Sequence, residues 1–274
     1  MSAVETRPYP ARGLLRIVPV GFVIRRPHRM IERHVVAYRR QWIIIVSGFF
    51  EPLFYLLSMR AGLGELVGTV TVAGREVGYD AFVAPALMAA SSMNGAVFDS
   101  TGNVFHRLKF SRIYDAALAT PMTPADVAAG EIGWALIRGQ LYAVSFLVVM
   151  AAMGLVTSWW VLMALPACAL IGFCFASLGF VGTTFMRGWT DMDIVTTVTM
   201  PLFLFSATFF PVSAYGSWRW VVQLSPLYHG VALVRAASTG TFGWASFAHA
   251  AVLLVVASAA LLVAARRIDH LLRR

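Results

Sequence analysis

The sequence predicts an all-α, polytopic membrane protein. We expect six transmembrane helices, an N-terminal amphipathic helix at the membrane surface, and a re-entrant pair of short helices on the outer side between helices five and six. Composition is the first reason, because 59% of the residues are hydrophobic and only 13% are charged, against about 25% charged in soluble domains. Repeated long apolar runs are the second, since they leave room for about six spans of ~20 residues. The third is that prolines cut one apolar stretch into pieces too short to cross a bilayer.

Residues 1–40 are expected to form a basic cytosolic arm that ends in a helix at 28–40. In this helix apolar side chains recur at steps of four, three and four, while arginines line another side. The apolar positions are Ile31, Val35, Tyr38 and Trp42. This pattern is typical of an amphipathic helix lying on the membrane surface, although a plain arm before the first span is the alternative. We expect His28 and His34 to be surface residues of this helix.

A single membrane domain is expected over residues 41–265, followed by a basic cytosolic tail at 266–274. A glycine-rich linker, 60–79, joins the first two spans. The six spans are expected at about 42–59, 80–102, 127–154, 159–186, 193–210 and 244–265.

The positive charges indicate how the domain is oriented. Of the 22 lysines and arginines, 17 fall in the N-terminal arm, in the two loops after even-numbered spans, or in the C-terminal tail. Positive charge collects on the cytosolic side of membrane proteins, so both termini are predicted to be cytosolic in a multi-pass protein of the plasma (inner) membrane. The same rule accounts for the net charge of +9, and no nucleic-acid partner is expected.

The sequence offers no catalytic, metal or cofactor site. A phosphate-binding loop needs a lysine behind a glycine-rich turn, and the only lysine, Lys109, has no such turn. Cys168 and Cys174 do not share a helix face, and the histidines have no metal-ligand spacing. We therefore expect no enzyme activity in this chain, and ATP hydrolysis, if it is used, belongs to a separate subunit.

Two charges fall inside predicted spans at similar depth, Glu51 in the first and Arg138 in the third. A lone charge at that depth costs at least ~2.5–3.5 kcal/mol, so we predict that they pair, either as structural glue or along a transport path. A proton-coupled secondary exporter using this pair is the alternative function, although no inverted repeat supports it. A membrane enzyme is a third class. Such an enzyme would be expected to carry a cluster of acids or histidines, and the sequence shows none. Asp191 and Asp193 are the only close pair, and they are better explained as acidic residues that stabilise the N-terminus of span five.

The longest predicted cytosolic loop is the coupling segment, 103–126. We expect one helix over 104–119 that ends before Pro121, after which Thr123 caps the next helix with Pro124 at its first position. A short rigid helix of this kind could receive force from a soluble motor. An ordinary connector is the alternative.

The re-entrant segment, 211–240, is the most unusual stretch. Breaks are expected at Pro211 and at Ser225–Pro226, leaving helices at 217–224 and 227–237 that reach only about 12 and 17 Å across a core of roughly 30 Å. Its predicted outer-gate residues are Pro211, Tyr215, Trp218, Trp220, Pro226, Tyr228 and His229. The aromatic residues fit either anchors at the membrane interface or a surface that stacks a sugar or drug. His229 could be structural or take part in gating.

Three motifs carry a resemblance to a known family. These are EPLFYLLSMRAGLGELVG at 51–68, YDAALATPMTPADVAAGE at 114–131, and PLFLFSATFFPVS followed by LSPLYHGVALVR within 201–235. In this order and spacing they resemble the membrane subunits of ABC-2 type exporters, and within them the subgroup of nodulation lipo-oligosaccharide and daunorubicin-type drug exporters. The resemblance covers nearly the whole chain. Ala207 departs from it, because a glycine is common there.

The resemblance implies a six-helix permease that pairs with a second membrane subunit, identical or paralogous, in contact with membrane lipid. Each copy would bind a cytosolic ATP-binding cassette subunit, which holds the ATP and Mg²⁺. Helix 28–40 would be the elbow helix, and the coupling residues facing the ATPase would be Arg107, Lys109, Arg112, Tyr114 and Asp115. The expected function is export of an amphipathic or lipid-linked substrate, either a drug or antibiotic or a glycolipid or polysaccharide.

Overall fold

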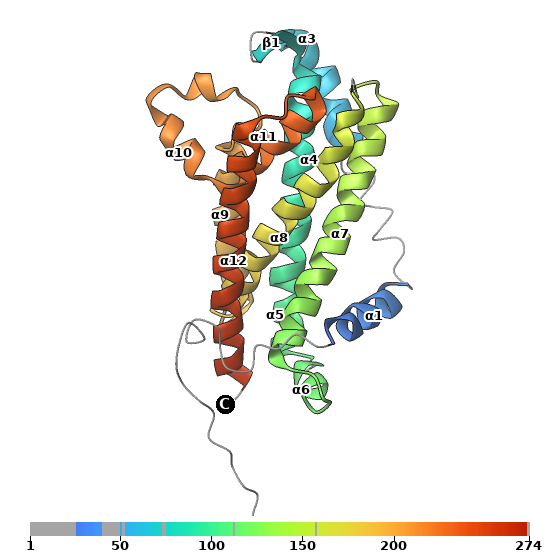
Figure 1. Cartoon of the computed structure of the whole chain (residues 1–274), viewed down its shortest axis with the longest axis vertical. Helices are drawn as coiled ribbons and strands as arrows, with labels where there is room; N and C mark the ends of the chain where they lie inside the picture. Colours follow the sequence, from blue (N-terminus) through green and yellow to red (C-terminus); the bar gives the residue numbers. More distant parts are fainter. Residues whose placement is uncertain are drawn as a thin grey trace, which may run out of the picture.

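The computed structural model describes residues 26–39, 50, 53–72, 75–111, 113–156 and 158–272. Long helices run side by side as a bundle (Figure 1). Within the described residues four segments are long and apolar enough to cross a membrane: Tyr79–Lys109, Pro124–Ala152, Trp159–Thr183 and Trp244–Ala264. The protein is therefore a helical, multi-pass membrane protein. The number of six spans stays a prediction, because most of span one, 42–59, lies outside the described residues.

Helix α4 (Tyr79–Phe98) is the centre of the bundle, and most of its residues are buried. It packs against α7 (Pro124–Ala152), α8 (Ala164–Thr183) and α11 (Pro226–Thr239). Alanines such as Ala84, Ala86 and Ala89 are fully buried, and small side chains let helix backbones approach closely in membranes. The 3₁₀ turn η4 (Trp159–Met163) leads into α8, which also packs along α12 (Trp244–Leu272).

The second span is longer than the sequence predicted. After α4 the chain continues through the π-helical turn η3 (Asp99–Asn103) into α5 (Val104–Lys109), so it does not stop near Gly102. The single coupling helix predicted at 104–119 is wrong. The backbone amides of Phe110 and Ser111 both bond to the carbonyl of His106, which closes α5, and a second short helix, α6 (Ile113–Leu118), follows.

The start of α7 is as predicted. Thr123 caps it, with Pro124 in the first turn, and Asp126 completes a capping box by bonding back to the Thr123 amide. Helix α1 (Pro27–Tyr38) packs against α7. Gly130 permits this contact, because a Cβ there would collide with the Cβ of Met30.

A β-hairpin stands where only a glycine-rich linker was expected. The chain passes through η2 (Met59–Gly64) and α3 (Glu65–Val67) into antiparallel strands β1 (Thr69–Val72) and β2 (Arg75–Gly78). The β-branched run of threonine and valine in β1 favours extended structure. The hairpin lies at the end of the bundle opposite α6 (Figure 1).

Helix α9 (Met192–Leu204) is shorter than the span predicted at 193–210. The turn η5 (Trp189–Asp191) precedes it. Beyond Leu204 the hydroxyls of Ser206 and Thr208 donate to the carbonyls of Leu202 and Phe203, and Ala207 adopts a φ of 57° that no α-helix allows. The 13 residues of α9 extend about 20 Å, which is less than the thickness of the hydrocarbon core of a bilayer.

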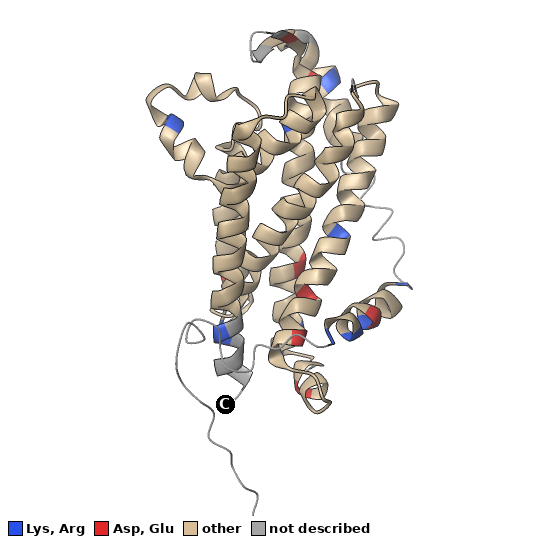
Figure 2. Ribbon diagram, in the orientation of Figure 1, with Lys and Arg blue, Asp and Glu red and all other residues tan. Residues whose placement is uncertain are grey.

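The two expected breaks after α9 are both present. Pro211 precedes the 3₁₀ segment η6 (Val212–Trp218), which leads into α10 (Arg219–Leu224), and Ser225 in extended conformation separates α10 from α11. This region lies at the end of the bundle away from α5 and α6 (Figure 1). Figure 2 shows acidic residues both toward the end that carries α1 and α6 and at the opposite end near α3, whereas the shafts of α8 and α12 are largely uncharged.

Candidate functional site

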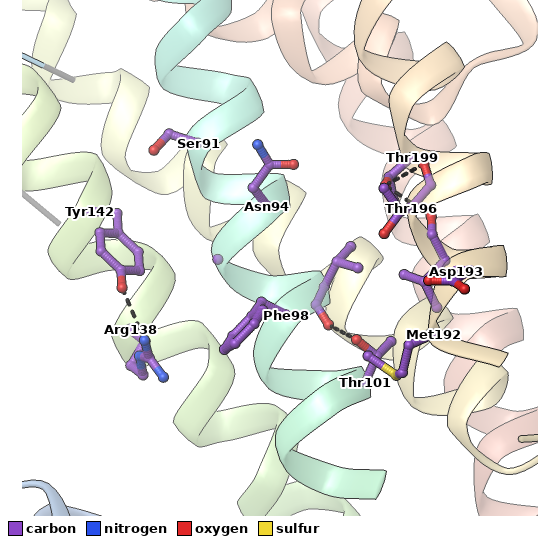
Figure 3. Close-up of a pocket in the computed structure, with 13 residues that line it drawn as sticks. Ser91, Asn94, Phe98, Thr101, Arg138, Tyr142, Met192, Asp193, Thr196 and Thr199 are labelled. Carbon is purple, nitrogen blue, oxygen red and sulfur yellow. Dashed lines mark hydrogen bonds between the residues drawn. The ribbon is translucent and has the colours of Figure 1, made fainter. Parts of the chain in front are cut away.

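A cavity of about 550 Å³ lies between α4, α7 and α9; its lining mixes polar and apolar residues, and because it is the more polar of two neighbouring cavities we call it the polar cavity. Figure 3 shows Arg138 and Tyr142 on α7, Asn94 and Phe98 on α4, and the hydroxyl-bearing face of α9 around this cavity. Its labelled polar residues are Ser91, Asn94, Thr101, Arg138, Tyr142, Asp193, Thr196 and Thr199. Hydroxyls, an amide and ionised groups can donate and accept hydrogen bonds to a polar ligand.

A second cavity of about 620 Å³ lies between α4, α8 and α9 and is mainly apolar. The two cavities share four lining residues, Val97, Thr101, Val195 and Thr199. They therefore adjoin, one polar and one apolar. Both volumes are in the range of small-molecule sites. Helix α9, which lines both cavities, has no buried residue.

Arg138 is held by a buried carboxylate that the sequence analysis did not consider. Its guanidinium pairs with Asp99 at 2.8 Å and donates to the hydroxyls of Tyr142 at 2.9 Å and Tyr38 at 3.2 Å. Glu51, its predicted partner, lies outside the described residues, so that pairing stays a prediction. The sequence does mark Asp99 as a candidate partner, because it is an acidic residue inside the span predicted at 80–102.

A second buried cluster joins α1, α5 and α7 at the end of the bundle that carries α6. Glu131 of α7 contacts His34 Nε2 at 3.1 Å and accepts a hydrogen bond from Arg107 of α5. The His34 ring also stacks on Trp134. His34 was predicted to lie on the surface, and this was wrong, because α1 turns that side chain toward α7. His28 is exposed as expected.

The predicted coupling residues divide into two groups. Arg107 and Tyr114 are buried, and burial raises the pKa of Tyr114 well above its ordinary value. Lys109 and Asp115 are exposed, whereas Arg112 lies outside the described residues. The first two can hold α5 and α6 in place, and only the exposed pair can touch another protein directly.

An aromatic surface that the sequence pattern did not indicate lies beside these helices. Phe110 is 58% exposed and Trp189 is 52% exposed, and their rings stack with centroids 6.0 Å apart. Trp189 comes from the short loop before α9. In that loop backbone amides of Arg187 and Gly188 lower the pKa of the Asp191 carboxyl. This aromatic surface therefore places the N-terminal end of α9 next to the coupling segment.

The predicted gate residues are spread over η6, α10 and α11. Tyr215 donates to the carbonyl of Leu204, the last residue of α9, at 3.2 Å. Trp218 and Trp220 are mostly exposed. Pro211, Pro226 and Tyr228 are partly exposed.

His229 has a partner that the sequence did not suggest, His249 of α12. Their Nδ1 atoms are 2.7 Å apart, and His229 Nε2 lies 3.0 Å from the carbonyl of Gln223 in α10. A carbonyl only accepts, so Nε2 of His229 donates and its Nδ1 accepts from His249. The imidazole pair therefore ties α10, α11 and α12 together.

Comparison with known proteins identifies the family. Residues 28–239 match the model of the ABC-2 type transporter family. Nodulation protein J of Sinorhizobium fredii (strain NBRC 101917 / NGR234) is 32% identical over 229 residues, covering 82% of this chain and 86% of that protein. Nodulation protein J of Rhizobium leguminosarum bv. trifolii is 33% identical, covering 74% of this chain and 78% of that protein. Its counterpart from Neorhizobium galegae is 28% identical, covering 88% and 87%. The chain therefore belongs to the ABC-2 type transporter family and is a membrane transport subunit.

Proposed function

We propose that this chain is the permease subunit of an ATP-driven exporter, and that its paired cavities receive a substrate with a saccharide head and an acyl chain. The observation that carries this proposal is the junction of a polar and an apolar cavity along one helix, α9. Hydroxyl and amide groups suit the saccharide, and the apolar cavity suits the chain. The relatives are nodulation proteins, and this subgroup of the family favours an acylated oligosaccharide over a drug.

ATP hydrolysis belongs to a cytosolic cassette subunit in this proposal, and both termini are cytosolic. The sequence has no phosphate-binding loop of its own, and α5, α6 and the loop before α9 form one continuous surface. Lys109, Phe110, Asp115 and Trp189 are exposed there and would contact the cassette. Arg107 and Tyr114 would carry the resulting force inward, since they contact the buried groups of α7 and its neighbours.

A second membrane subunit completes the path. Helix α9 leaves Ile194, Val198 and Met200 more than half exposed, and Asp193 and Thr196 on the same helix are exposed as well. A charged group on a bare lipid-facing surface is costly. A partner copy across α9 would enclose the two cavities, and η6 to α11 would close them at the outer end.

To test this, the purified chain is reconstituted in vesicles together with the ATPase encoded beside it in the genome. The probe is an oligosaccharide that carries one fluorescent long-chain acyl group. We expect ATP-dependent movement of the probe that vanadate stops. Transport driven by a proton gradient without any ATPase would contradict the proposal and favour the proton-coupled alternative.

Two variants test the assignment of the cavities. Thr196→Val removes a hydroxyl from the polar cavity, and Val198→Asn adds a polar group to the apolar one. Val198→Asn should weaken binding of the acylated probe by about tenfold, and by more than Thr196→Val does. For a non-acylated oligosaccharide the order should be reversed, so that Thr196→Val weakens binding more than Val198→Asn. Equal effects of both variants on both probes would contradict the division of roles.

A crosslink tests the outer closure. Tyr215→Cys in both membrane subunits, joined by a thiol crosslinker, should stop transport while the ATPase still copurifies. Transport that continues after complete crosslinking would remove η6 to α11 from the path.

A further inference from the structure

A half-buried arginine in α11, Arg235, has no acidic partner among the described residues. Arg235 takes part in none of the four ion pairs described. Its guanidinium lies over the ring of Phe82, with Cζ 4.0 Å from the ring centroid. A cation on an aromatic face is stabilised by the ring's quadrupole, more so when water is excluded. A neutral side chain would pack there at lower cost, so the retained charge calls for another explanation.

Through one nitrogen, Nη2, Arg235 bonds to two different elements, while its buried Nε has no partner among the described residues. Nη2 donates to the carbonyl of Ala207 at 3.1 Å and to the carbonyl of Phe82 in α4 at 3.4 Å. Ala207 is fully buried and stands in the left-handed region, where the helix can no longer supply a partner for its carbonyl. The guanidinium therefore satisfies a carbonyl that the end of α9 exposes, at a helix terminus that favours positive charge.

The same break is tied to α11 a second time. The hydroxyl of Ser206 lies 2.6 Å from the hydroxyl of Ser225, the residue that precedes α11. Ser206 and Ala207 therefore connect to α11 at two points, through Ser225 just before its start and through Arg235 in its C-terminal half. Since α9 itself has no buried residue, its C-terminal end is attached mainly by these contacts and by the bond from Tyr215 to the carbonyl of Leu204.

We propose that Arg235 is a positioning residue that couples the cavity-lining helix α9 to the short helices α10 and α11. A substrate that displaces α9 moves Ala207, and Arg235 passes this movement to α11 while its stacking on Phe82 fixes the pivot on α4. The closing element at the far end of the bundle then follows the occupancy of the cavities. This inference rests on the proposed function, because it assumes that the cavities hold the substrate.

The test uses the reconstituted complex with two spin-label positions. One label is at Thr197→Cys, an exposed position of α9, and the other at Ser217→Cys, an exposed position of η6. In the otherwise native chain, adding the acylated oligosaccharide probe should change the spectrum of both spin labels. In Arg235→Gln the probe should change only the spectrum of the label on α9. Transport per ATP hydrolysed should fall by about ten- to a hundredfold, whereas basal ATP hydrolysis should be unchanged. Arg219→Gln, at an exposed arginine of α10, is the matched control and should behave as the native chain.

Milder variants cover the case in which Arg235→Gln fails to fold. Arg235→Lys keeps the charge but loses the planar guanidinium that stacks on the Phe82 ring, and Ser206→Ala removes only the second tie. Each should weaken the response at residue 217 more than the response at residue 197. If Arg235→Gln, or Arg235→Lys in its place, leaves both responses and transport as they are in the native chain, the inference is wrong. If the probe shifts neither label in the native chain, the cavity assignment in the proposed function fails instead.

Discussion

At the residue scale, the pairing of Arg138 with Asp99 shows how a buried charge is accommodated. Asp99 accepts from Arg138 and from Asn103, while Tyr38 and Tyr142 occupy further guanidinium donors. Such a cluster depends on every member, because removing one partner of a buried pair leaves the other charge uncompensated.

Asp99→Asn should therefore lower the free energy of unfolding by about 3–5 kcal/mol, measured by denaturation in detergent. Arg138→Met should cost a similar amount, and the double variant should cost much less than the sum. The matched cycle pairs Arg138→Met with Glu51→Gln. Additive effects there would reject the predicted contact between Glu51 and Arg138, and strong non-additivity would support it.

The two imidazoles between α11 and α12 predict a pH effect. Burial lowers the pKa of His229 from its ordinary 6.5, so the folded protein favours the neutral ring. A lowered histidine pKa means that the unfolded chain binds more protons, and stability should fall as the pH drops below about 6.5. Protonating both rings would also place a hydrogen on each facing Nδ1 atom and break the bond.

His249→Asn keeps a donor near the Nδ1 position but cannot titrate. Its thermal unfolding should depend less on pH between about 6.5 and 5 than that of the native chain. His28→Asn, at an exposed histidine of α1, is the control and should leave the pH dependence unchanged. An unaltered profile in His249→Asn would mean that the pair does not titrate in this range.

At the scale of elements, the contact between α1 and α7 is set by glycine. Gly130→Ala gains about 0.5–1 kcal/mol of helix propensity but forces a Cβ into Met30 and against the carbonyl of Pro27. Overpacking costs about 1–3 kcal/mol, so the net effect should be destabilising and should release α1.

Gly133→Ala is the matched control on the same helix. A Cβ there meets the terminal carbon of Ile31 at 3.0 Å, and the end of a flexible side chain can move. Gly133→Ala should therefore be neutral or slightly stabilising. Limited proteolysis near residue 26 would report the difference, with faster cleavage expected only in Gly130→Ala.

Some helix boundaries could be predicted from the sequence, and others could not. Proline and capping signals are local, so Pro211, Pro226 and Thr123 mark boundaries that the structure has as well. The end of α9 and the turn after α5 depend on hydroxyl and amide bonds to carbonyls. Those bonds require knowing the conformation first, and hydropathy alone extends such a helix through Ser206 and Thr208.

Contacts between distant segments were beyond the sequence for a different reason. Asp99 and Arg138, or His229 and His249, are far apart in the chain, and their pairing depends on helix rotation within the bundle. Rotation is fixed by packing of small and large side chains along α4 and α8, for which hydropathy carries almost no signal. The sequence could name buried charges as candidates, but it could not choose their partners.

At the scale of the whole molecule, the two segments that we propose for coupling and for closure are well separated. The coupling segment and the re-entrant segment lie at opposite ends of the bundle (Figure 1), and the cavities lie along the helices between them. Any signal from one end to the other must pass along these helices, and α4, α7 and α9 line the cavities on the way.

This arrangement predicts opposite access to a membrane-impermeant thiol reagent. Ser217→Cys in η6 should be labelled in intact cells, whereas Ser111→Cys beside α6 should be labelled only after the membrane is opened. Native Cys168 and Cys174 are buried and should remain unlabelled. Labelling of both introduced cysteines from the same side would contradict the proposed topology.

The weak attachment of α9 has a consequence for biosynthesis. The ribosome delivers α9 before Ser225, Arg235 and α12 exist, and the short helix with its exposed Asp193 cannot remain in a bilayer on apolar length alone. It must stay with the insertion machinery until α11 emerges and supplies its two ties. We therefore expect a late checkpoint in the maturation of this protein, because a chain that stalls before residue 235 would leave α9 without its tie to Arg235.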